Sequence, residues 1–144
     1  MKVLFDSSAL IAAFVESHPK HNEARKWLSR AKRKEIEYVV AGHSLFEVYS
    51  VLTSAPFQPR ITPGIAQELL KENVEDHAQI ITLSKKDHHR IIQKLAEQNL
   101  KGGIVYDAII AECAIKAKAD QMITSNSKDF VRIFPEDSIQ IVSL

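Results

Sequence analysis

The chain has 144 residues, 45% of them hydrophobic and 26% charged, and its formal net charge of +1 gives no global sign of nucleic-acid binding. This length fits one compact domain and leaves no room for a second, so we expect a single domain over residues 1–144. The single cysteine excludes an internal disulfide and a cysteine zinc cluster, and without a signal-peptide pattern or an apolar run of about 18 residues we expect a cytoplasmic protein with no membrane span.

Apolar, β-branched runs alternate with segments of helical periodicity from the start of the chain. A strand is predicted over Lys2–Asp6, and Ser7 and Ser8 open a helical pattern that continues to Phe14. The next predicted elements are a helix from Pro19 to about Lys34, a strand over Glu37–Val40, a helix over His43–Thr53 and, after a proline-rich connection at 54–64, a helix from Pro63 to about Glu75 that Thr62 can cap.

The alternation continues through the second half of the chain. Its predicted elements are a strand over Ile80–Leu83, a helix over Ser84–Gln98, a helix from Val105 to about Ala119, and strands over Gln121–Thr124 and Ile139–Val142. Repeated strand–helix units form parallel sheets through right-handed crossovers, with helices on both faces. The pattern therefore predicts an α/β fold around a mostly parallel sheet of five strands.

Four acidic residues stand where such a fold would bring their side chains together: Asp6, Glu47, Asp107 and Asp129. Asp6 ends the first strand, and the carboxyl ends of parallel strands form the crevice in which such sheets bind ligands. An Asp followed by a helix can instead cap that helix, and this second interpretation stays open. Asp129 follows the fourth strand, and it emerges beside Asp6 if the first and fourth strands are neighbours.

The other two acids lie in apolar helices. Glu47 is surrounded by apolar residues, so we expect it near the core, and no basic partner for its carboxylate is evident. Asp107 stands near the beginning of its helix, where the helix dipole also favours a carboxylate. In the same helix Glu112 and Lys116 are spaced i,i+4, and we expect this pair on the solvent face.

The residue types at these positions point to a hard divalent cation. Four carboxylates in one crevice repel each other strongly without a cation. Oxygen ligands without cysteines favour Mg²⁺ or Mn²⁺ over zinc. The six histidines form no metal-spaced pair on a helix, and we expect each of them at the surface or at a helix cap. Cys113 lies in an apolar helix and is expected to pack in the core.

Over almost its whole length the sequence resembles the PIN domain, and within it the VapC-type toxins of VapBC toxin–antitoxin pairs. Each matching motif alone is weak, but their order and spacing together are fairly specific. The motifs are Asp6–Leu10 after the opening strand, His18–Ala24, Glu47 inside an apolar helix, Tyr106–Ala111 and Ile123–Phe130.

The resemblance implies a three-layer α/β/α sandwich and a metal-dependent endoribonuclease that hydrolyses RNA phosphodiester bonds. Asp6, Glu47, Asp107 and Asp129 match the acidic quartet of the family and would hold one or two Mg²⁺ or Mn²⁺ ions, with Ser8, Thr124 and Asn126 at supporting polar positions. Many relatives have an acid where Asn126 stands, so Asn126 could share the role of Asp129. The resemblance also implies an RNA substrate, an antitoxin partner and a homodimer.

Other functions remain as alternatives. A haloacid dehalogenase-type phosphatase needs a second Asp two residues after the first, where this chain has Ser8. A receiver domain needs an acid pair near its first strand, and Asp6 has no acidic neighbour. Within the PIN family, a housekeeping RNA-processing nuclease and an inert module that binds RNA or protein stay open, although an inert relative should have lost some of the four acids.

Overall fold

The computed structural model describes residues 1–134 and 138–144. In these residues five strands form one sheet in the order β3-β2-β1-β4-β5, and every neighbouring pair is parallel. The prediction of a mostly parallel five-stranded sheet is confirmed, and so is the adjacency of the first and fourth strands. The strands are β1 (Lys2–Phe5), β2 (Glu37–Ala41), β3 (Gln79–Ile81), β4 (Gln121–Thr124) and β5 (Gln140–Ser143).

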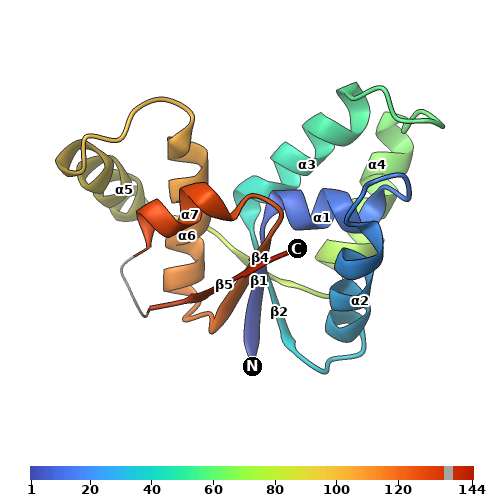
Figure 1. Cartoon of the computed structure of the whole chain (residues 1–144), viewed down its shortest axis with the longest axis horizontal. Helices are drawn as coiled ribbons and strands as arrows, with labels where there is room; N and C mark the ends of the chain where they lie inside the picture. The colour runs from blue at the N-terminus through green and yellow to red at the C-terminus, as the bar shows by residue number, and fades with distance from the viewer. Residues whose placement is uncertain (135–137) are drawn as a thin grey trace.

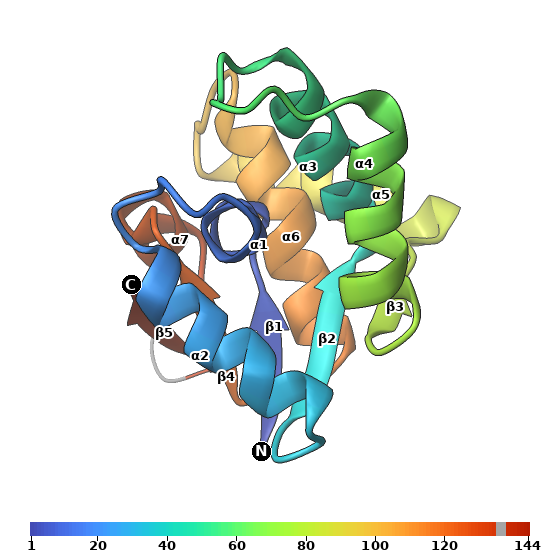
Figure 2. The ribbon, with the colours of Figure 1, turned by 90° about the vertical axis from the view of Figure 1, so that its right-hand side faces the viewer.

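Helices cover both faces of the sheet, which confirms the three-layer α/β/α architecture (Figure 1). One layer holds α1 (Ser7–Phe14), α2 (His21–Lys32), α3 (Gly42–Ser54), α4 (Pro63–Leu70) and the π-helical segment η1 (Lys71–Glu75). The other layer holds α5 (Lys85–Glu97), α6 (Ile104–Lys116) and α7 (Ser127–Ile133). Figure 2 shows α1, α2 and α4 in front of the sheet and α6 behind it. No helix in the described residues is long and apolar enough to cross a membrane.

The sheet separates two hydrophobic cores, and the central strand contributes to both. Val3 and Phe5 of β1 pack in the core beneath α1 to α4, whereas Leu4 between them packs in the core beneath α6 and α7. All three side chains are fully buried, as expected for a strand that is covered on both faces. Cys113 packs in the second core with 1% of its surface exposed, as predicted.

Two elements differ from the sequence prediction. The helix that begins at Pro63 widens into the π-helical segment η1 after Leu70. The seven-residue helix α7 was not predicted, because its segment is too short to show a helical period and begins with the turn-forming residues Ser125, Asn126 and Ser127. It matters for function because Asp129 lies in its first turn.

The prediction that Glu112 and Lys116 pair on the solvent face is wrong for Glu112, whereas Lys116 is exposed. Glu112 is 5% exposed and accepts a hydrogen bond from Arg90 Nε at 2.8 Å, because α5 packs over this face of α6. Lys116 instead reaches Asp87, with Nζ 2.9 Å from Oδ2. Lys94 Nζ of α5, 3.4 Å from Glu112 Oε2, completes an ionic network that fastens α5 to the helix carrying Asp107.

The Asp87→Asn variant is expected to have a lower melting temperature than the wild type at neutral pH. Asp87 closes the capping box of α5 with Ser84 and binds both Lys116 and Arg90. The Lys116 hydrogen bond, followed by the Ser84 N–H, holds the pKa of Asp87 well below its usual range. A carboxylate whose pKa is lowered by folding stabilises the fold at pH values above the ordinary Asp pKa, and this stabilisation is lost in acid. Thermal melts from pH 3 to 7 should show the deficit shrinking below about pH 4, while Asp76→Asn, at an exposed Lys71 pair, shows little deficit.

Candidate active site

The first strand delivers Asp6 to the point where the strand order of the sheet reverses. The chain leaves β1 toward β2 on one side, whereas β4 on the other side leads to β5. Such switch points are where open α/β sheets bind ligands. The Asp6 N–H donates to Ile123 O of β4 at 3.0 Å, which continues the strand pairing up to the acid. The carboxylate therefore stands at the carboxyl end of two central strands.

Two hydroxyl groups hold the buried Asp6 carboxylate. Ser8 Oγ and Thr124 Oγ1 both donate to Asp6 Oδ2, at 2.7 and 2.8 Å, and the two hydroxyl oxygens are 3.1 Å apart. The side chain makes no capping hydrogen bond to α1, so the cap interpretation of Asp6 is wrong. Burial raises the pKa of Asp6, and the two hydroxyls partly offset that rise.

The same hydroxyls fix the loop between β4 and α7. Ser8 Oγ accepts from the Ser125 N–H at 3.0 Å, and Thr124 Oγ1 accepts from the Asn126 N–H at 2.9 Å. Ser8 and Thr124 thus lie where supporting residues were predicted. Asn126 contributes its backbone, because its residue is exposed and its side chain makes no capping hydrogen bond to α7. The loop orients the first turn of α7 and with it Asp129.

Glu47 lies in the second turn of α3 and is less buried than predicted. Its side chain is 34% exposed, because this helix turns its neighbour Phe46 outward rather than into the core. Burial, and then the negative charge of Asp6, raises the pKa of Glu47, while the nearby Ser7 side chain lowers it. Ser7 Oγ donates to Ser44 Oγ at 2.8 Å, which ties the start of α1 to the start of α3.

His43 is a site residue that the sequence analysis missed. Its Nε2 lies 3.1 Å from Glu47 Oε1, so Glu47 has the basic neighbour that was not evident from sequence. The two atoms are buried and do not meet in hydrogen-bonding geometry, and neither has another hydrogen-bond partner in the described residues. The i,i+4 spacing of His43 and Glu47 on a predicted helix was the signal that could have found it.

Asp107 interacts electrostatically with the other three acids of the predicted site. Burial raises its pKa to about 6, assisted by the charges of Asp6, Asp129 and Glu47 and by a hydrogen bond with Asp129. Coulomb interactions of this kind require the carboxylates to lie close to one another. The structure thus brings the four predicted site residues to one end of the sheet, from β1, α3, α6 and α7.

The donor atoms of the cluster fit a hard divalent cation. They are carboxylate oxygens, which Mg²⁺ and Mn²⁺ prefer, and Glu47 Oε1 is buried without a hydrogen-bond donor. Among the described residues, no three acidic, histidine or cysteine side chains stand close enough together to hold one ion as they are. The carboxylates interact electrostatically, but in this conformation the four acids are not arranged as a coordination shell.

The match to a known protein family spans all four clustered acids. The family model described as "PIN domain" matches residues 3–133, which is most of the chain. The chain belongs to the PIN domain family. This PIN domain is 33% identical over 115 residues to Ribonuclease VapC27 of Mycobacterium tuberculosis, covering 80% of this chain and 78% of that protein. It is 29% identical over 119 residues to Ribonuclease VapC40 of the same species, covering 83% and 82%.

Solved structures of low sequence identity share the fold of this PIN domain. VapBC2 from Rickettsia felis, bound to a DNA fragment from its promoter, matches with a TM-score of 0.70 and 19% identity over 100% of this chain and 99% of that chain. The sarcin–ricin loop cleaving toxin VapC20 of Mycobacterium tuberculosis matches with a TM-score of 0.71 and 13% identity, over 94% and 98%.

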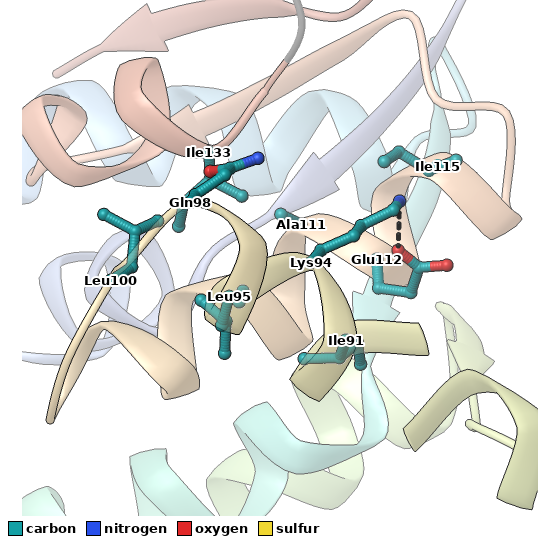
Figure 3. Close-up of a pocket in the computed structure, with 10 residues that line it drawn as sticks. Ile91, Lys94, Leu95, Gln98, Leu100, Ala111, Glu112, Ile115 and Ile133 are labelled. Carbon is teal, nitrogen blue, oxygen red and sulfur yellow. Dashed lines mark hydrogen bonds and ion pairs between the residues drawn. The ribbon is translucent and has the colours of Figure 1, made fainter. Parts of the chain in front are cut away.

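A cavity of the PIN domain lies apart from the acids, between α5, α6 and α7 (Figure 3). Its walls are mostly apolar, with Ile91, Leu95 and Ile115 among them, and Lys94 pairs with Glu112 at its edge. None of the four clustered acids lines it. The cavity therefore belongs to the packing between these helices and not to the acidic site.

In the absence of divalent ions, the free energy of unfolding of this PIN domain is expected to fall as the pH rises from about 4 to 7. The pKa of Asp107 in the folded protein, about 6, exceeds the ordinary aspartate value of 3.8. The folded state therefore binds more protons than the unfolded state in this window, and deprotonation destabilises it.

The Asp107→Asn variant should show a shallower pH slope and, at pH 7 in EDTA, a free energy of unfolding higher by about 1 kcal/mol, a figure reduced for solvent screening. Urea denaturation at several pH values measures both quantities, with Asp76→Asn as the control at an exposed ion pair. Equal slopes in wild type and Asp107→Asn would mean that neither burial nor the neighbouring carboxylates raise the pKa of Asp107.

Proposed function

We propose that this protein is a metal-dependent endoribonuclease that hydrolyses RNA phosphodiester bonds and acts as the toxin of a toxin–antitoxin pair. The observation that carries the proposal is the cluster of Asp6, Glu47, Asp107 and Asp129 at the carboxyl end of the sheet, three of them with raised pKa values. The names of the relatives support it, since proteins 33% and 29% identical to this chain are called ribonucleases.

The four acids would hold one or two Mg²⁺ or Mn²⁺ ions, and the side chains of Glu47, Asp107 and Asp129 would rotate inward to do so. A divalent ion in such a site supplies a nucleophile from water at neutral pH and offsets the charge that builds up on the scissile phosphate. The resemblance to PIN-domain ribonucleases implies that this hydrolysis would leave 5′-phosphate and 3′-hydroxyl ends.

The chain itself supplies positioning. The Ser8 and Thr124 hydroxyls fix the orientation of Asp6, and the same two oxygens hold the loop that leads to Asp129. The buried Asp6 carboxylate, already oriented by these hydroxyls, needs little rearrangement when charge develops in the reaction, and such preorganisation is a major source of electrostatic catalysis. His43 Nε2 lies 3.1 Å from Glu47 Oε1, and this contact would keep the Glu47 carboxylate near the site.

The partner would be a small antitoxin protein. Similar folds occur in VapBC structures from Rickettsia felis and Haemophilus influenzae, whose names pair a toxin with its antitoxin. We expect this chain to form a homodimer and its antitoxin to block the acidic crevice. Coexpression with the product of a short adjoining reading frame should then yield a complex and restore growth.

The proposed activity is tested with purified protein and a pool of single-stranded RNA of random sequence. With Mg²⁺ or Mn²⁺ the wild type is expected to produce fragments with 5′-phosphate ends, detected by ligation of an adaptor that requires this end. Induced expression is expected to arrest growth. Cleavage without growth arrest would favour a housekeeping nuclease, and binding without cleavage would favour an inert PIN-like module.

A further inference from the structure

Two parallel rings stand beside the acidic site: that of His43, which neighbours Glu47, and that of Tyr106, which has no part in the proposed chemistry. Tyr106 directly precedes Asp107 on α6, and His43 lies one turn before Glu47 on α3. Their ring planes are inclined by only 6°, with centroids 5.6 Å apart. The stacked pair therefore bridges the two helices that carry two of the four acids.

The two rings are held differently. His43 Nε2 is buried against Glu47, so the edge of the imidazole is directed toward the acids while a face lies against Tyr106. Tyr106 is 54% exposed, although a ring of this size normally buries most of its surface. The imidazole thus supports an aromatic ring that remains open to solvent at the edge of the site.

The surface around the His43 and Tyr106 rings is suited to binding a neutral, flat group. His43 also lines a groove between α3, α6 and the end of β3, together with Phe46, Ile109 and Leu83. Among the described residues that line this groove there is no Lys, Arg, Asp or Glu, and Phe46 is 75% exposed at its edge. The nearby Lys116 ammonium is bound to Thr82 O and Asp87, so a phosphate group would find no free cation in the lining beyond a protonated His43 or His88, whereas an aromatic face beside an apolar groove suits a nucleobase.

We propose that Tyr106, supported by His43, is a stacking platform for one unpaired nucleobase of the RNA substrate next to the scissile phosphate. This inference rests on the proposed ribonuclease function and names its substrate class. A base inside a duplex has both faces covered, so the platform requires single-stranded RNA or a loop whose base can swing out. Stacking tolerates every base, because each has a π-face.

The test compares Tyr106→Ala, Tyr106→Phe and the control Tyr49→Ala, an exposed tyrosine of α3 that lines a different groove. The substrate is a short single-stranded RNA taken from a site cut in the random pool. Tyr106→Ala is expected to raise KM by about 5- to 150-fold with little change in kcat, the range for loss of one base–aromatic contact. Tyr106→Phe and Tyr49→Ala should keep the wild-type KM.

Abasic nucleotides placed one by one around the cut locate the stacked base. In the wild type an abasic nucleotide at one position should raise KM as much as Tyr106→Ala does, and combining the two changes should add little. A wild-type KM for Tyr106→Ala, or an equal loss in Tyr49→Ala, overturns the platform while cleavage itself survives. So does a Tyr106→Ala variant that changes only the oligomeric state, because the ring would then be a protein contact. If the wild type cuts no RNA with Mg²⁺ or Mn²⁺, the proposed function fails first.

Discussion

Replacing Asp6 by asparagine is expected to lower kcat/KM for RNA cleavage by at least about 10³-fold, because the change removes a central charge from the proposed metal site. Asp6 is 4% exposed and receives hydrogen bonds from Ser8 and Thr124. Asparagine keeps the shape of the side chain, and its carbonyl oxygen can accept the same hydrogen bonds. The fold should therefore survive, and removing a buried charge should not lower the stability of the metal-free protein.

Single-turnover cleavage of a labelled RNA measures the effect, and circular dichroism with a thermal melt checks the fold. Asp120→Asn is the matched control, because Asp120 Oδ2 accepts from the Lys2 N–H at the opposite end of β1. It should cleave like the wild type. Residual cleavage by Asp6→Asn within tenfold of the wild-type rate would remove Asp6 from the mechanism.

Chelation of divalent ions by EDTA is expected to abolish cleavage, and adding Mg²⁺ or Mn²⁺ to the metal-free protein should raise its melting temperature. Binding at about 100 times the dissociation constant stabilises a folded protein by about 2.7 kcal/mol, which corresponds to about 5–10 °C for a domain of this size. Burial and then repulsion by neighbouring carboxylates raise the pKa values of Glu47 and Asp107, and the ion binds their deprotonated forms, so the metal-induced rise should be larger at pH 7.5 than at pH 5.

Asp6→Asn and Asp107→Asn should each lose most of this metal-induced rise, whereas Asp120→Asn should keep it. Differential scanning calorimetry of the four proteins, with and without the ion, makes the comparison. Cleavage that persists in excess EDTA would contradict the role of the metal. An equal rise in Asp6→Asn would place the ion elsewhere.

The central strands and their acids were predictable because short-range signals agree with one another there. Val3, Leu4 and Phe5 form a short apolar run that is typical of a buried strand, and Asp6 interrupts it where a helical pattern begins. The neighbouring position of Thr124 then follows from the parallel pairing of β1 with β4. Periodicity and the rules of α/β topology suffice for this part of the site.

The remaining features depend on which helix covers which face, and periodicity does not reveal that. The sequence predicts an exposed Glu112, but α5 packs over it and Arg90 binds its carboxylate. The position of Tyr106 against His43 requires α3 and α6 to meet across the end of the sheet, although the two residues are 63 positions apart in the sequence. These contacts arise from tertiary packing.

The central claim is that the acidic cluster cuts RNA, and sequencing of RNA 5′ ends after brief induction in cells tests it most directly. Cells expressing the wild type are expected to accumulate new 5′-phosphate ends at a small number of defined, unpaired positions within minutes, and cells expressing Asp6→Asn at the same level should show none of them. The same new ends in both cultures, or no new ends in either, would contradict the assignment of Asp6, Glu47, Asp107 and Asp129 as a ribonuclease site.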